Sequence, residues 1–335
     1  SETIRPAIYL LEDYISFLIH TDVIGAKAKY AQETNAILPK ISREKKIYFK
    51  NAYHPILWRK NKQQNLKTVA QTINLNEQQQ IIVISGPNAG GKSITLKTIG
   101  LLQLMLQSGI LIPVDERSQT YIFDTILTDI GDNQSIENQL STYSYRLKNM
   151  RYFLRKCNDK TLFLIDEFGT GSDPELGGAL AEIFLEEFYH KKAFGIITTH
   201  YSNLKVLANE LENVTNANMQ FDERSLEPLY KLFIGQAGSS FTFEVAQKNG
   251  IPFSLINKAK KRVETEKVRL DKTISKLQKE RNRLQKNSDN LEKQKSKGQE
   301  HLDNLKEKEQ KVQDKLSGFQ ELYDQNQKML SLGRK

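Results

Sequence analysis

The chain has 335 residues, enough for one large domain or two ordinary domains with sizeable cores. Only 38% of the residues are hydrophobic, and the net charge of +9 is uneven: residues 261–335 hold 20 Lys and Arg against 13 Asp and Glu, which leaves +2 for residues 1–260. The single cysteine, Cys157, excludes an intramolecular disulfide, and neither a membrane span nor a signal peptide is visible, so we expect a cytoplasmic protein without membrane contact.

Residues 1–45 predict a helical lead-in. Apolar residues recur at helical spacing over residues 6–34, with an interruption at residues 20–22, and this pattern predicts two helices that pack against the following domain. Because the pattern starts almost at the first residue and no initiator Met is present, we expect a fragment of a longer protein.

An alternating segment after residue 46 predicts a strand at Ile47 and Phe49, followed by a turn. In that turn His54 precedes Pro55, which restricts the histidine to an extended backbone. A histidine there is either a buried, hydrogen-bonded residue or a functional one.

The rest of the chain is organised around residues 81–98. An apolar run enters a loop with the spacing G-x-x-x-x-G-K-S, and the loop leads directly into a helical pattern, an order typical of a phosphate-binding loop. Its glycines let backbone N–H groups approach phosphate oxygens, and the positive end of the helix favours anions. Lys92 can reach the outer phosphates, and Ser93 can ligate Mg²⁺. We assign nucleotide binding to Gly86, Pro87, Asn88, Ala89, Gly90, Gly91, Lys92, Ser93 and Ile94.

Gly109 and Pro113 end this helix, and two short apolar runs follow, residues 121–123 and 126–130. A polar loop then leads into an amphipathic helix that extends to Met150. Ser141 and Thr142 stand at its N-terminus, where they either cap the helix or present hydroxyl and backbone N–H groups outward.

A buried strand over residues 161–168 ends in two carboxylates. Asp166 at the strand tip can hold Mg²⁺, and the adjacent Glu167 can orient an attacking water. Asp173 precedes a helix that runs to about residue 189, and the next apolar strand places His200 at its carboxyl end. Ligands gather at that edge of an open parallel sheet, which favours a functional role for this histidine.

Two β-like runs, residues 214–221 and 226–234, can extend the sheet, and residues 241–262 predict a helical hairpin that closes a core or meets another subunit. From residue 263 onward apolar residues recur every seven positions in a charged background, which predicts a coiled coil. Gly298 marks a hinge or hairpin point within it. Such a coil is either a solvated spacer or a surface whose excess lysines contact nucleic acid.

The segments GPNAGGKS, LSTYS, IDEFGTGSDP and TTHYSNLK together resemble those of the MutS ATPases, relatives of the ABC-type ATPases, and most resemble the bacterial branch called MutS-two. The resemblance covers about residues 20–262, including the YHP segment around His54 and the hairpin. It implies a P-loop α/β fold of RecA-like type.

The resemblance also implies a role for each site residue. The phosphate loop and His54 would bind ATP, Ser93 and Asp166 would hold Mg²⁺, and Glu167 would position water. Ser141 and Thr142 would contact the nucleotide of a second subunit, Asp173 would lie at the dimer seam, and His200 would sense the γ-phosphate. Glu167, Lys92 and His200 are therefore the candidate catalytic groups.

We predict an ATPase with a lead-in at residues 1–45, an ATPase domain at 46–240, a dimerisation hairpin at 241–262 and a coiled coil at 263–335. The resemblance implies a homodimeric, ATP-driven clamp on branched or double-stranded DNA, with roles in suppressing recombination or in rescuing stalled ribosomes. The nuclease patterns with which this branch ends do not occur here, so no endonuclease activity is assigned to these residues. The alternatives are a chromosome-maintenance ATPase of the SMC or Rad50 type and a nucleotide-gated scaffold in which hydrolysis is incidental.

Overall fold

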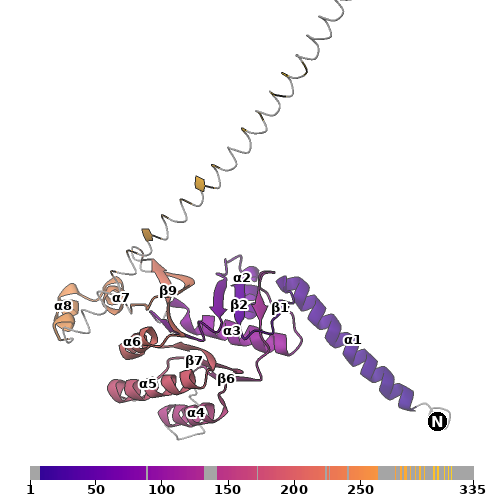
Figure 1. Ribbon diagram of the computed structural model, residues 1–335, viewed down its shortest axis with the longest axis horizontal. Helices are drawn as coiled ribbons and strands as arrows, with labels where there is room; N and C mark the ends of the chain where they lie inside the picture. Colours follow the sequence, from indigo (N-terminus) through magenta and orange to yellow (C-terminus); the bar gives the residue numbers. More distant parts are fainter. Residues whose placement is uncertain are drawn as a thin grey trace, which may run out of the picture. The chain divides into compact units, whose positions relative to one another are not determined.

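The computed structural model describes residues 8–87, 90–131, 142–171, 173–222, 225, 227–239 and 241–262, together with isolated positions between 276 and 318 (Figure 1). The chain divides into two units, Ser1–Ser275 and Lys276–Lys335. The first unit contains two β-sheets and the helices that pack against them.

The larger sheet formed by the described residues has the strand order β10-β9-β4-β8-β7-β6. All neighbouring strands are parallel except β10, which is antiparallel to β9 and forms one edge. The strand bounds are β4 Ile81–Ser85, β6 Thr125–Asp129, β7 Thr161–Ile165, β8 Phe194–Thr198, β9 Val214–Asp222 and β10 Glu227–Ile234.

Helices cover both faces of this sheet, which explains why its central strands read as continuous apolar runs. On one face, the alternate residues Ile82 and Ile84 share a hydrophobic core with α3 (Lys92–Gln107). On the other face, Ile81 and Val83 share a second core with three further helices, α4 (Thr142–Lys156), α5 (Pro174–His190) and α6 (Ser202–Glu210).

A second sheet has the order β1-β5-β2-β3, with bounds Lys40–Ile41, Gln119–Thr120, Ile47–Ala52 and Gln71–Leu75. Its buried residues belong to the same core as α3, so this helix packs between the two sheets. Gln103 of α3 joins it to the second sheet, because its side chain accepts a hydrogen bond from Thr120 Oγ1 at 2.8 Å and donates one to the carbonyl oxygen of Tyr121 at 2.8 Å.

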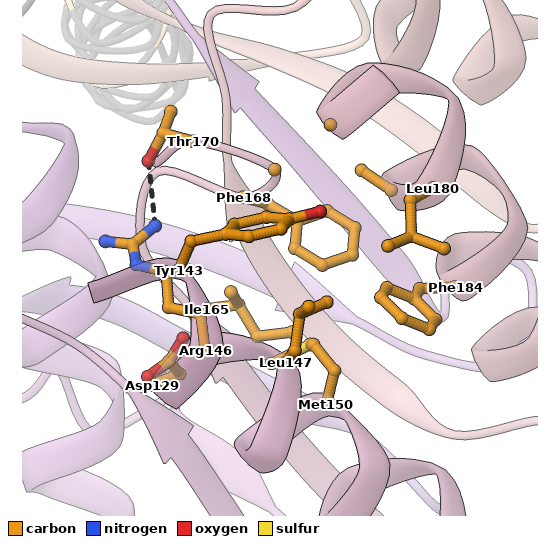
Figure 2. A pocket seen from close by; sticks show the side chains of 13 residues that line it. Asp129, Tyr143, Arg146, Leu147, Met150, Ile165, Phe168, Thr170, Leu180 and Phe184 are labelled. Carbon is orange, nitrogen blue, oxygen red and sulfur yellow. Dashed lines mark hydrogen bonds between the residues drawn. The ribbon is translucent and has the colours of Figure 1, made fainter. Parts of the chain in front are cut away.

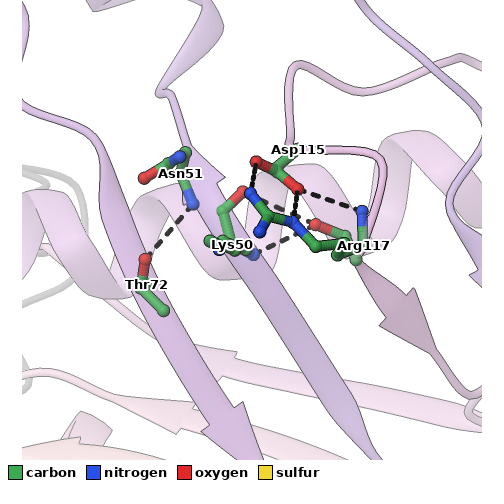
Figure 3. A network of polar contacts seen from close by, with 6 residues as sticks. Lys50, Asn51, Thr72, Asp115 and Arg117 are labelled. Atoms are coloured by element: carbon green, nitrogen blue, oxygen red, sulfur yellow. Dashed lines mark hydrogen bonds and ion pairs between the residues drawn. The ribbon is translucent and has the colours of Figure 1, made fainter. Parts of the chain in front are cut away.

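Polar contacts fix the turn that enters β5 (Figure 3). Arg117 donates from Nε to Asp115 Oδ1 and from Nη2 to Oδ2, each at 2.8 Å. These bonds hold the pKa of the Asp115 carboxyl well below its usual range. On β2, Asn51 has a left-handed backbone with φ 48°, at the point where the register with β3 shifts. Its backbone N–H donates to Thr72 Oγ1 at 3.2 Å.

The expectation of two N-terminal helices is wrong, because α1 is one helix over Ile8–Thr34. At the expected break the polar side chains bond back onto the helix: His20 Nδ1 lies 2.7 Å from the Ser16 carbonyl oxygen, and Thr21 Oγ1 donates to that of Phe17 at 2.8 Å. The apolar side chains of α1 were also expected to pack against the following domain. Most of those between residues 9 and 24 are exposed instead. Recorded contacts of α1 with the domain lie near its C-terminal end, as between Lys27 Nζ and the Ser108 carbonyl oxygen at 3.3 Å.

The strands predicted near Ile47 and over residues 161–168, 194–198, 214–221 and 226–234 are confirmed as β2, β7, β8, β9 and β10, although β7 already ends at Ile165. The helices predicted after the phosphate loop, at Ser141 and Thr142, and after Asp173 are confirmed as α3, α4 and α5. Five elements were not predicted: β1, α2 (Pro55–Gln63), β3, β5 and α6. Residues 121–123, an apolar run in the sequence, form no strand.

The helical hairpin is confirmed as α7 (Thr242–Lys248) and α8 (Phe253–Arg262). In the second unit, the described positions between Lys276 and Gly318, Gly298 included, are helical. The coiled coil and a hinge or hairpin at Gly298 stay predictions. Within the described part of the chain, no helix has both the length and the apolar character needed to cross a membrane.

Candidate active site

The phosphate loop follows β4, a central strand of the larger sheet. Gly86 and Gly91 have positive φ values of 130° and 91°, and Gly91 is the N-cap of α3. A Cβ on Gly91 would lie 3.2 Å from Cδ1 of Tyr230, and one on Gly90 would lie 3.1 Å from Cβ of Met219. The glycines thus meet both a backbone and a packing requirement, as expected for a loop whose N–H groups cradle phosphates.

The side chain of Lys92 is buried and bonded to its own loop. Its Nζ donates to the carbonyl oxygens of Gly86 at 2.7 Å and Pro87 at 3.0 Å. Burial lowers its pKa to about 8, although Asp166 and Glu167 act in the opposite direction. Burial disfavours the charged form of Lys92, and a bound phosphate would stabilise that form through its negative charge. Ser93 is half-buried and Ile94 exposed in the same first turn of α3.

The two predicted carboxylates follow β7 and are joined by Thr198 at the end of β8. Thr198 Oγ1 donates to Asp166 Oδ1 at 2.5 Å and accepts from the backbone N–H of Glu167 at 2.8 Å. Asp166 is buried, and Glu167 has a left-handed backbone with φ 52°. Because β8 lies between β4 and β7, this threonine stands between the phosphate loop and the carboxylates.

His200 follows β8 by two residues, and its Nε2 is buried without a hydrogen-bond partner among the described residues. Burial, followed by the charges of Lys92 and Lys205, lowers its pKa to about 4, with Asp166 opposing. The imidazole is therefore neutral at pH 7. A buried polar atom without a partner costs free energy, so this nitrogen fits a site that receives a polar ligand.

These observations bring Lys92, Asp166, Glu167 and His200 together at the carboxyl end of the sheet, with electrostatic interactions between the lysine and both carboxylates and between the histidine and the lysine. The residues present fit a nucleotide with Mg²⁺. Magnesium at such sites takes one or two protein ligands and completes its shell with phosphates and waters, so a hydroxyl and a carboxylate would suffice. That Ser93 and Asp166 supply them stays a prediction.

The other predicted site residues either lie away from these four side chains or are not among the described residues. Asp173 is exposed and caps α5, where its Oδ1 accepts from the backbone N–H groups of Glu175 at 2.9 Å and Leu176 at 3.1 Å. Thr142 begins α4. Asn88, Ala89 and Ser141 lie outside the described residues.

His54 is the N-cap of α2, and its Nδ1 accepts from the backbone N–H of Leu57 at 3.3 Å. It is extended as predicted, and burial, with a smaller effect from Lys97, lowers its pKa. These contacts match the first alternative, a buried and hydrogen-bonded histidine. A contact between His54 and a nucleotide remains a prediction.

Sequence reasoning missed Thr198, Arg146 and Tyr230. Tyr230 lies at a bulge of β10, has φ 53° and is 47% exposed, and its ring borders Gly91. Gln71 of β3 holds this bulge, since its Nε2 donates to the Tyr230 carbonyl oxygen at 2.5 Å. The local sequence of β10 does not indicate that Tyr230 lies beside the phosphate loop. Strand pairing in the folded sheet places it there.

A family model described as MutS domain V matches residues 82–267. Three relatives, each named endonuclease MutS2, come from Finegoldia magna, Enterococcus faecalis and Lactiplantibacillus plantarum. They are 45%, 44% and 41% identical over 263, 253 and 260 residues. The matches cover 78%, 76% and 78% of this chain but only 32%, 31% and 32% of those proteins, so the chain spans about a third of the length of these relatives.

Proposed function

The chain belongs to the MutS family, and from this premise we propose that it is the ATPase part of a DNA-binding protein, hydrolysing ATP to ADP and phosphate. The observation that carries the proposal is the convergence of Lys92, Asp166, Glu167 and the unpartnered Nε2 of His200 at one edge of the sheet. Family membership favours this function over the SMC or Rad50 alternative.

In the proposed reaction, a water oxygen attacks the γ-phosphorus, the bond to the β,γ-bridging oxygen breaks, and ADP leaves. Lys92 would exchange the carbonyl oxygens of Gly86 and Pro87 for phosphate oxygens. Ser93 and Asp166 would hold Mg²⁺, which supplies charge neutralisation. Glu167 would orient the water, whose protons pass to phosphate and solvent, and the neutral imidazole of His200 would bond a γ-phosphate oxygen through Nε2.

We also propose that the active form is a homodimer. Exposed apolar side chains support this: Ile251, Phe253 and Leu255 on the hairpin, and Leu176 beside Asp173. A second copy would cover them and would bring Ser141 and Thr142 to the partner's nucleotide. The hairpin and Asp173 would then lie at the dimer seam.

The DNA target and the downstream role are part of this proposal. The relatives are named endonucleases, but we assign no nuclease step to these residues. A clamp on branched or double-stranded DNA that suppresses recombination, and action on stalled ribosomes, are the two targets to compare.

A titration separates this function from the scaffold alternative. ATP turnover and dimer fraction would be measured against chain concentration, with and without branched DNA or ribosomes, using Lys92→Ala as the blank. The proposal requires turnover that depends on Lys92 and rises with dimer fraction, and stimulation by one of the nucleic acids identifies the target. Nucleotide binding with no Lys92-dependent turnover under any condition would favour the scaffold.

A further inference from the structure

Arg146 of α4 contacts the segment that carries Glu167, and Figure 2 shows its bond to Thr170 in that segment. Its Nη1 donates to the carbonyl oxygen of Glu167 at 2.7 Å and lies 3.3 Å from that of Asp166. The same nitrogen donates to Thr170 Oγ1 at 2.8 Å, and that hydroxyl donates to the Glu167 carbonyl oxygen, also at 2.8 Å. Arg146 and Thr170 thus clamp one peptide group beside the proposed water-orienting carboxylate.

This segment has an unusual backbone, in which the Thr170 N–H also donates to the Glu167 carbonyl oxygen at 3.1 Å. Glu167 is a non-glycine residue at φ 52°, and Gly169 follows at φ 90°. Left-handed conformations cost free energy in residues with a Cβ and persist where surrounding contacts fix them. The far side of the segment is fixed by Tyr201, whose hydroxyl donates to the Gly169 carbonyl oxygen at 3.1 Å. Arg146 is the charged contact on the near side.

The helix that carries Arg146 is itself anchored. One turn further along α4, Asn149 Nδ2 donates to Asp129 Oδ1 at the end of β6 at 3.0 Å. Apolar side chains of α4, Leu147 and Met150, line the same pocket as Leu180 and Phe184 of α5 (Figure 2). Because α4 begins at Thr142, one turn before Arg146, the guanidinium joins the start of α4 to the Glu167 backbone.

We propose that Arg146 is a positioning residue for ATP hydrolysis: it fixes the peptide group of Glu167 so that the carboxylate meets the attacking water, and it makes this alignment depend on the placement of α4. The inference rests on the proposed function, in which Glu167 orients the water. In this inference Arg146 does not contact the nucleotide. Replacing Arg146 should therefore slow ATP turnover without weakening nucleotide binding.

The test uses the 335-residue chain and three variants. Arg146→Met keeps the apolar stem and removes the guanidinium, Arg146→Lys keeps the charge, and Thr170→Val removes the hydroxyl at constant shape. We expect kcat to fall about tenfold or more in Arg146→Met, the usual scale for losing a charge-assisted bond. The Kd of a fluorescent ADP analogue should stay within about twofold, since no binding group is removed. Arg146→Lys should recover part of kcat, and Thr170→Val should lower it by a smaller factor.

Lys148→Met is the matched control, because Lys148 is exposed on the same helix and loses the same charge. Its kcat should equal that of the parent. If kcat of Arg146→Met also equals that of the parent, the inference is wrong. It is equally wrong if both Arg146 variants lose kcat and melting temperature while the Kd for the nucleotide rises. Should Arg146→Met fail to fold, kcat of Arg146→Lys and Thr170→Val decides by the same criteria. A parent chain with no Lys92-dependent turnover would instead overturn the proposed function itself.

Discussion

The hydroxyl of Thr198 donates to Asp166 Oδ1 at 2.5 Å while accepting the backbone N–H of Glu167 at 2.8 Å. One side chain on β8 therefore contacts the Asp166 carboxylate and the Glu167 backbone, both just after β7. The proposed metal ligand and the proposed water-orienting group are coupled through it.

Removing this hydroxyl at constant shape, by Thr198→Val, should lower kcat by about tenfold to a hundredfold, because a charge-assisted bond and a backbone bond are lost together. Steady-state ATPase assays at saturating Mg²⁺ and at graded lower concentrations would measure kcat and the apparent Mg²⁺ affinity, which should fall with it. Thr215→Val on β9 is the control, since it makes the same replacement in a strand without a carboxylate partner. Equal kcat values for the two variants would contradict the assigned role of Thr198.

Lys92 and Glu167 should separate binding from chemistry. Lys92→Ala should abolish nucleotide binding, whereas Glu167→Gln should bind ATP and hydrolyse it slowly, because only the second residue acts on the water. Equilibrium binding of a fluorescent nucleotide and single-turnover hydrolysis give the two quantities. Lys97→Ala, an exposed lysine on the same helix, should resemble the parent. Turnover of Glu167→Gln at the parent rate would remove Glu167 from the mechanism.

The lowered pKa of Lys92, about 8, predicts a pH dependence of nucleotide affinity. Above pH 8 the free protein loses the ammonium charge that phosphates require, so the Kd should rise with pH over 8–9.5. The bound phosphates favour the charged form, so binding in this range should take up a proton. Calorimetry in two buffers of different ionisation enthalpy measures that uptake. Uptake that is the same at pH 7 and pH 9 would show that Lys92 does not titrate there.

Tyr230 should contribute to nucleotide affinity through its ring, which borders Gly91 and is about half exposed. Tyr230→Ala should weaken binding of a fluorescent ADP analogue by about twofold to tenfold, the scale of one aromatic contact. Tyr230→Phe should bind like the parent. Leu229→Ala changes the exposed neighbour and serves as the control. If Tyr230→Ala binds as tightly as Leu229→Ala, the ring does not contact the nucleotide.

Much of the site is readable from local chain chemistry. The spacing from Gly86 to Ser93 requires glycine where the backbone is left-handed, and the apolar run before Asp166 and Glu167 leads into a buried strand whatever the rest of the fold does. The same holds for His54, where the following proline enforces an extended backbone. Local rules failed at residues 20–22, where side chains that usually end helices bonded back onto α1.

The sequence alone determined the phosphate loop, the carboxylate pair and the strand that ends before His200, because each depends on residues within a few positions of one another. Only the tertiary structure decided that Thr198 joins the carboxylates, that Arg146 clamps the Glu167 backbone and that Tyr230 borders Gly91. These contacts link residues 20 to more than 100 positions apart. Their existence follows from strand order and helix packing, which no local pattern of residues specifies.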